Sequence, residues 1–133
     1  MTRDAAMTGP ELETLIRRGM QGEAVDVIGA LLRSELVVPS GGAVGPNFEG
    51  FVPVLFDRGE IPMLAVFTSL ELTTKVSHQA RFALTMTGRD LVLRMPSGHG
   101  LVVNPGHEVG FELFPDAVQA VARRAREAAA PDR

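Results

Sequence analysis

Residues 88–106 read GRDLVLRMPSGHGLVVNPG and carry more structural information than any other part of the chain. The first residues, Gly88-Arg89-Asp90, predict the start of a short helix, because Asp90 would lie near the positive end of the helix dipole. The run 96–100 predicts a glycine-rich loop, 100–104 a buried strand, and Asn104-Pro105-Gly106 a tight turn. Backbone groups and polar side chains therefore gather at the ends of regular elements, where a binding site could form.

The composition bounds the class of protein. The chain has 133 residues, of which 45% are hydrophobic and 22% charged, as expected for one globular domain. Its net charge of −3 weighs against a nucleic-acid partner, which usually requires a basic surface. Without cysteine there are no disulfides, thiolate metal ligands or cysteine nucleophiles. No apolar run reaches the roughly 20 residues that a membrane span needs. We expect one cytoplasmic domain over residues 1–133, with no cofactor.

Two helices and a strand are predicted in the first third of the chain. Residues 1–8 are expected to be frayed, and Thr8-Gly9-Pro10 starts the first helix, since proline suits the first helical position. The second helix is expected over 22–34, where apolar residues recur at helical spacing. A short strand should follow at 36–39. The loop 40–50 holds four glycines and one proline, and we expect it to be flexible, either as a flap or as a hairpin insertion.

A hairpin is the next predicted feature. Two apolar runs, 51–56 and 61–67, flank a turn at 57–60. Neither run alternates with polar residues, so we expect both faces of both arms to be covered. Pro53 and Pro62 cannot donate ladder hydrogen bonds and must lie at an edge, a strand start or a bulge. An apolar strand pair with such prolines suits a sheet that stops at a dimer interface. The residues expected at this interaction surface are Phe51, Pro53, Pro62 and Phe67.

The second half of the chain completes an α+β domain. Thr68-Ser69-Leu70-Glu71 fits a capping box at the start of a helix over 69–75. Alternation over 82–87 predicts a half-buried strand ending at Thr87, a suitable N-cap for the helical turn that follows. A further short strand is expected over 109–113 and a C-terminal helix from Pro115. The predicted fold is a single α+β domain with two N-terminal helices, a mixed sheet of about five strands that includes a largely buried hairpin central in the sequence, and the C-terminal helix packed on the sheet.

Four polar side chains form the candidate binding site. An arginine beside the free amides of a helix start could receive an anion or a carboxylate, and three polar residues follow on the loop and the strand end. The structural alternative is that this arginine pairs with Asp90 or Glu112 and that the asparagine caps a turn. No spacing typical of a metal site, a hydrolase nucleophile or a phosphate loop is present, so we predict no catalytic residue and no metal. The candidates are Arg89, Ser97, His99 and Asn104.

The chain resembles the SseB protein N-terminal domain family. Four pieces carry the resemblance and together span about residues 24–122: ALLRSELVVP (30–39), PV (53–54) through LAVFTS (64–69), GRDL (88–91) and LVVNPG (101–106). The resemblance implies a compact cytosolic domain of helices and strands that occurs alone or beside a second domain. The family name comes from a serine-sensitivity phenotype, and the resemblance carries over no catalytic residue.

Two functions fit the sequence. The first is a non-catalytic interaction module that acts as a homodimer or docks to a protein partner, since apolar strands with edge prolines require a cover. The second is a small-molecule or anion binder, with an enzyme as one form of it, using a pocket around Arg89 and Asn104. Gathering of the four candidate side chains around one cavity would favour the second function, and dispersal would favour the first.

Overall fold

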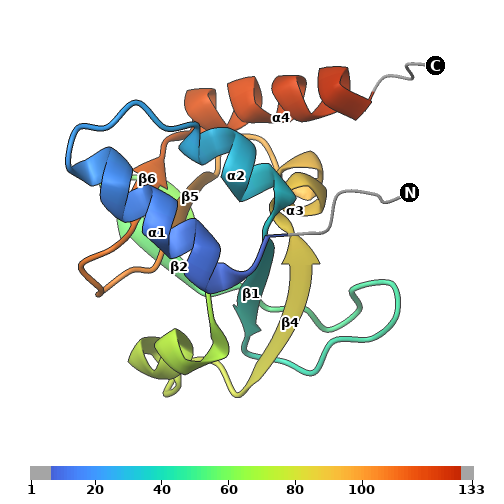
Figure 1. The fold of residues 1–133 in the computed structure, drawn as a ribbon. Helices are drawn as coiled ribbons and strands as arrows, with labels where there is room; N and C mark the ends of the chain where they lie inside the picture. Colours follow the sequence, from blue (N-terminus) through green and yellow to red (C-terminus); the bar gives the residue numbers. More distant parts are fainter. Residues whose placement is uncertain (1–6, 130–133) are drawn as a thin grey trace, which may run out of the picture.

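The computed structural model describes residues 7–129, in which helices and strands form a single α+β domain (Figure 1). The predicted fold class is confirmed, and α4 packs on the sheet as expected. In chain order the elements are α1 (Gly9–Met20), α2 (Val27–Arg33), β1 (Glu35–Ser40), β2 (Leu55–Arg58), β3 (Ile61–Val66), the 3-10 helix η1 (Leu70–Val76), β4 (Phe82–Thr87), α3 (Gly88–Arg94), β5 (Gly100–Val103), β6 (Phe111–Leu113) and α4 (Pro115–Ala129).

The strands form two sheets, and isolated bridges from β1 join the smaller sheet to chain segments that flank the larger one. The larger sheet has the order β2-β3-β5-β6, with β3 and β5 parallel and the other neighbours antiparallel. The smaller sheet is the antiparallel pair β1-β4. Val37 and Phe67 exchange two backbone hydrogen bonds of 2.8 and 2.9 Å, which join β1 to the chain just after β3. The expected mixed sheet is therefore divided between two joined sheets.

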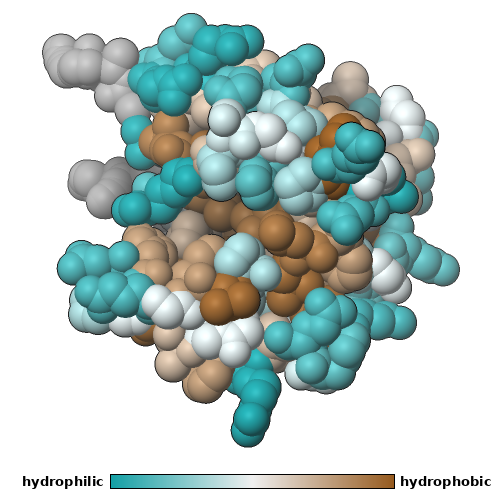
Figure 2. Space-filling model, turned by 180° about the vertical axis from the view of Figure 1, so that it is seen from behind, coloured by the Kyte–Doolittle hydropathy of each residue, from teal (hydrophilic) through white to brown (hydrophobic). Residues whose placement is uncertain are grey.

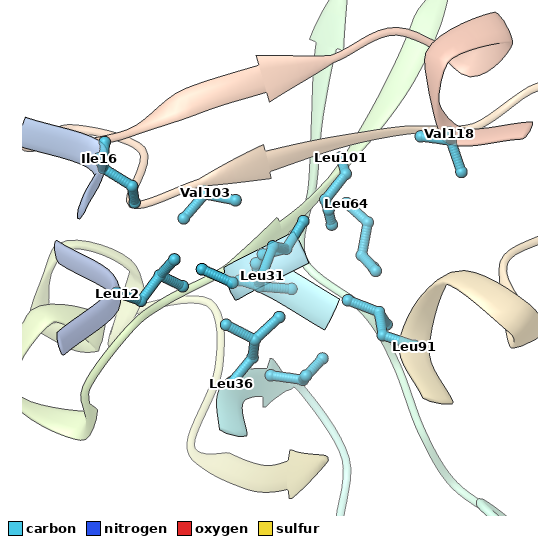
Figure 3. Close-up of a cluster of buried hydrophobic side chains, with 12 residues drawn as sticks. Leu12, Ile16, Leu31, Leu36, Leu64, Leu91, Leu101, Val103 and Val118 are labelled. Atoms are coloured by element: carbon cyan, nitrogen blue, oxygen red, sulfur yellow. The ribbon is translucent and has the colours of Figure 1, made fainter. Parts of the chain in front are cut away.

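Alternation along β3 builds a core on each face of the larger sheet. Leu64 and Val66 point to the helices, while Met63 and Ala65 point to the opposite face. The helix-side core collects side chains from all four α-helices, and Figure 3 shows them converging from separate elements. The opposite core is closed by η1 and the chain that follows it. The labelled helix-side residues are Leu12, Ile16, Leu31, Leu36, Leu64, Leu91, Leu101, Val103 and Val118.

The predicted hairpin is present, but the expectation that both arms are buried is wrong for its first arm. β3 is largely buried, whereas all four residues of β2 are exposed. The pairing of Arg58 with Ile61 leaves a two-residue loop at Gly59-Glu60, with Gly59 at a positive φ of 65°. β2 is exposed because it is the edge strand of the sheet, a position that an apolar pattern cannot reveal.

The two hairpin prolines lie where a missing N–H costs no ladder bond. Pro62 is opposite Asp57, one residue before the parallel pairing of β3 with β5 begins at Met63. Pro53 lies outside the named strands, in an isolated bridge with Ser40. Both positions match the edge or strand-start character that the sequence requires.

The starts of α1 and α3 lie where the sequence predicts them, because in each the N-cap threonine bonds an amide three residues further along the chain. Thr8 forms a capping box with Glu11, so Thr8 is held in place; residues 1–6 of the segment expected to fray lie outside the described residues. Thr87 caps α3 as predicted, its Oγ1 accepting a 3.1 Å bond from the Asp90 amide. α2 begins at Val27 rather than at 22, because Gly22 has a φ of 92°, outside any right-handed helix.

The capping box predicted at Thr68–Glu71 is wrong. Ser69 occupies the N-cap of η1 and makes no capping bond through its side chain. The Thr68 hydroxyl instead donates a 2.5 Å hydrogen bond to the Glu13 carboxylate on α1. A contact between distant segments thus replaces the local cap.

An ion pair joins α4 to the start of α2. Asp26 caps α2 through a 3.0 Å bond from the Gly29 amide to its Oδ1, and Arg124 Nη2 donates to its Oδ2 at 2.6 Å. The guanidinium of Arg124, and then the Gly29 amide, hold the pKa of the Asp26 carboxyl below its usual value. Both partners are exposed, so the contribution of this pair is small.

We expect the Asp26 contribution to stability to be lost in acid. A carboxyl whose pKa is lower in the folded state stabilises above its unfolded value, about 3.9, and stops doing so as the pH falls through the folded value. Asp26→Asn should therefore be less stable than the wild type at pH 7, and the difference should shrink as the pH falls through the lowered pKa of the Asp26 carboxyl. Urea midpoints measured across this range check the prediction, and a difference that stays constant with pH would contradict it.

Candidate functional site

Asn104, the residue directly after β5, is the most constrained of the four candidate residues. It is 2% exposed and has a left-handed backbone, with φ at 59°. Its Oδ1 accepts a 3.0 Å bond from the Thr68 amide, and its Nδ2 donates to Thr68 Oγ1 at 3.1 Å and to the Val109 carbonyl at 2.8 Å. The side-chain amide is thereby saturated by the protein itself. Asn104 fixes the loop after β5 against the chain after β3.

The other three candidates do not gather around Asn104. His99 precedes β5 and Asn104 follows it, so the length of a strand separates them. The Nδ1 atom of His99 lies 3.3 Å from the Ser97 carbonyl oxygen, which keeps these two neighbours together. Asn104 borders one cavity and His99 another, and the linings of the two include neither Arg89 nor Ser97.

Arg89 lies on the first turn of α3 beside Asp90. Its Nη1 is 3.9 Å from Asp90 Oδ1, and both side chains are exposed, at 40% and 54%. Glu112, the other partner considered from sequence, pairs with Arg58 instead. Any role of Arg89 in ligand binding stays a prediction.

Arg89→Ala is expected to change the free energy of unfolding by no more than about 0.5 kcal/mol, because a long, exposed ion pair contributes little. Chemical denaturation at neutral pH measures the change. A loss above about 1 kcal/mol would mean that Arg89 has a structural contact beyond Asp90.

The larger cavity, about 590 Å³, lies on the face of the sheet opposite the helix-side core. Arg58 at the end of β2 reaches across it to the carboxylate of Glu112 on β6. Lys75 and His107 lie on the wall formed by η1 and the loop after β5. The His107 Nε2 lies 2.9 Å from the Leu72 carbonyl oxygen, and its ring packs edge-on against Phe67. Charges of both signs thus surround an apolar floor, and Arg58 and Glu112 already pair with each other.

The smaller cavity, about 360 Å³, lies between the loop before β2, the edge of the larger sheet and α3. Phe48 and Phe51 from the loop and Leu91 from α3 contribute apolar walls. Arg94 and His99 supply its ionisable groups, and the lining holds no carboxylate. Sequence reasoning identified His99 but missed Arg94 and Phe48, because no local pattern links two residues so far apart.

The four residues predicted to form the interaction surface lie in different environments and do not form one surface patch. Phe67 is fully buried against His107, so it cannot belong to a surface, and its expected role there is corrected. Phe51 and Pro53 line the smaller cavity, and Pro62 is half-buried in the hairpin. The exposed apolar residues of this region that sequence reasoning did not select are Val52, Leu55 and Phe56.

Within residues 7–129, no group of three or more histidine, aspartate or glutamate side chains is placed to hold a metal ion. No helix in the same range is both long and apolar enough to cross a membrane.

Comparison with known proteins places the chain in a family. The family model of the SseB protein N-terminal domain matches residues 12–120. No curated protein and no solved structure matches the chain significantly. Because the match spans most of the 133 residues, the chain belongs to the SseB N-terminal domain family, as the four motifs predict.

Proposed function

We propose that this member of the SseB N-terminal domain family is a non-catalytic cytoplasmic interaction module that forms a homodimer by pairing β2 with β2 of a second copy. The observation that supports this most is the exposed sheet edge. Leu55 is 41% and Phe56 36% exposed, and within residues 7–129 β2 pairs with β3 alone. An edge strand offers unpaired backbone donors and acceptors to another strand. Figure 2 shows apolar residues gathered in and beside a hollow on the face turned away from the viewer in Figure 1.

The ladder within the hairpin determines which backbone groups of β2 point outward. The Ala65 amide donates a 3.0 Å hydrogen bond to the Val54 carbonyl, so Val54 turns its polar groups toward β3. Since the direction alternates along an antiparallel strand, Phe56 also faces β3, while Leu55 and Asp57 face outward. These two residues are the ones able to bond a second strand.

One antiparallel register satisfies these groups about a twofold axis. Leu55 of one copy lies opposite Asp57 of the other, which gives four backbone hydrogen bonds in the symmetric pair. Phe56 then lies opposite Phe56 at the closely spaced position, where aromatic pairs are favourable. Shifting the register one way places Asp57 opposite Asp57, and shifting it the other way places Pro53, which has no N–H, opposite Asp57.

The proposed dimer is transient. A pairing restricted to the four residues of β2 is small, and interfaces below about 1,200 Å² in total belong to weak, exchanging complexes. We therefore expect reversible association that depends on protein concentration. Sedimentation velocity over a wide range of concentration tests this directly.

Phe56→Glu is expected to raise the dimer dissociation constant by at least about tenfold, because it removes the aromatic pair and places two like charges opposite each other. The matched control is Phe82→Glu, which changes a phenylalanine on β4 that is 46% exposed and belongs to the other sheet. The control should associate as the wild type does. A wild type that stays monomeric at every concentration rejects the dimer, and equal weakening by both variants rejects its placement at β2.

A further inference from the structure

The smaller cavity, about 360 Å³, is within the size range of small-molecule sites, and its walls are almost entirely apolar. Phe48 and Phe51 close it on the side of the loop, Leu55 and Leu64 on the side of the sheet, and Leu91 on the side of α3. Because three separate parts of the fold form these walls, the cavity is built by tertiary structure and is not the gap beside one loop. An apolar ligand of modest size would lose much of its contact with water there.

The ionisable groups on the lining are Arg94 and His99, and no carboxylate accompanies them. Arg94 makes no ion pair within 4.0 Å to any carboxylate of residues 7–129, unlike Arg58, whose carboxylate partner is Glu112. The guanidinium carbon of Arg94 lies 4.5 Å from the centre of the Phe48 ring, so the ring covers one flat face of the group. The N–H donors around the edge of the guanidinium remain available to an acceptor.

Phe48 holds this position with a strained backbone. Its φ of 64° is a left-handed conformation that costs a bulky residue roughly 1–3 kcal/mol. The loop around it is closed by hydrogen bonds: the Phe48 amide donates to the Gly45 carbonyl at 3.0 Å, and the Gly45 amide donates to the Glu49 carbonyl at 2.8 Å. The loop hydrogen bonds hold Phe48 in this strained conformation, and its ring lies against Arg94 at the wall of the cavity.

We propose that this cavity binds an amphiphilic monocarboxylate of the medium-chain fatty acid type. The hydrocarbon chain lies among the phenylalanine and leucine side chains, and the carboxylate accepts hydrogen bonds from the edge of Arg94. Charge complementarity selects the head group, because the lining offers a cation without a competing anion. His99 from the predicted set lies on the lining of this cavity, and Arg94 takes the place of the predicted Arg89.

The test compares decanoate with 1-decanol and decyltrimethylammonium at concentrations below micelle formation. Titration calorimetry and thermal denaturation are run at a protein concentration where the chain is monomeric, so that the result does not depend on pairing through β2. Decanoate should bind and raise the melting temperature, decanol should bind about tenfold more weakly or worse, and the cationic amphiphile should not bind. No binding of decanoate, or equal binding of decanol, overturns the proposal.

Two arginine variants on α3 locate the head group. Arg94→Gln should raise the dissociation constant of decanoate by about tenfold and leave that of decanol unchanged. Arg89 is an exposed arginine on the same helix and lies outside the cavity lining. The Arg89→Gln variant should therefore bind decanoate as the wild type does. Equal losses in both variants would show a general charge effect and overturn the assignment to Arg94.

Discussion

Asn104→Ala is expected to lower the free energy of unfolding by about 3 kcal/mol or more. The change leaves the amide of Thr68 and the carbonyl of Val109 without the side-chain partner they have now. A buried polar group that loses its partner costs about 1–3 kcal/mol, and a small domain has only about 5–15 kcal/mol in total. Urea denaturation followed by far-ultraviolet circular dichroism measures the loss.

A second substitution separates the two parts of this effect. Because Asn104 has a φ of 59°, alanine adds a backbone cost that glycine does not have. Asn104→Gly should therefore be about 1 kcal/mol more stable than Asn104→Ala while still losing the hydrogen bonds. A cost below about 1 kcal/mol for Asn104→Ala would mean that the hydrogen bonds to Thr68 and Val109 contribute little to the free energy of unfolding.

Features that depend on neighbours in the sequence could be predicted. The Thr87 cap, the strand β5 and the helix from Pro115 each follow from a few adjacent residues and lie where the pattern places them. The family is likewise visible in short motifs, and the match over residues 12–120 confirms it. Local chemistry is sufficient in these cases because the cap, the apolar spacing and the turn residues act within one or two turns of chain.

Features that depend on the order of strands could not be predicted. The apolar runs 51–56 and 61–67 look alike in the sequence, yet the second forms buried β3 whereas the first ends in the exposed edge strand β2. Thr68 looks like a cap from its neighbours, yet its hydroxyl donates to Glu13, a residue on another helix. A sequence pattern indicates the local preference of a residue. The tertiary fold determines which distant group contacts it, and that contact can replace the local one.

The candidate site illustrates the same limit. Sequence reasoning chose Arg89 for its helix start, but Arg94, one and a half turns further along α3, is the arginine on the lining of the smaller cavity. Its neighbour on that wall, Phe48, comes from a loop whose composition predicts only irregular structure. Asn104 was chosen as a binding residue, a role that stays a prediction; in the structure its side-chain amide joins two segments of the core.

Gly88→Ala is expected to destabilise the protein by about 3 kcal/mol or more, although helix propensity alone predicts a gain of about 1 kcal/mol. A Cβ added at Gly88 would lie 2.0 Å from the carbonyl oxygen of Leu31 and 2.8 Å from its carbonyl carbon. Both atoms belong to the backbone of α2 and cannot rotate away. The start of α3 would have to move off α2, which would strain the 2.9 Å bond from the Gly88 amide to the Ser34 carbonyl and loosen Leu91 from the helix-side core.

Gly98→Ala is the matched control for this prediction. Gly98 has a φ of 81°, but a Cβ added there meets no atom within 4 Å, so the substitution carries only the backbone cost of about 1–2 kcal/mol. Gly88 has no such backbone cost, and its whole effect comes from contact between α3 and α2. Urea midpoints should therefore rank the wild type first, Gly98→Ala second and Gly88→Ala last. A Gly88→Ala protein as stable as the wild type would mean that α2 and α3 are farther apart than this fold places them.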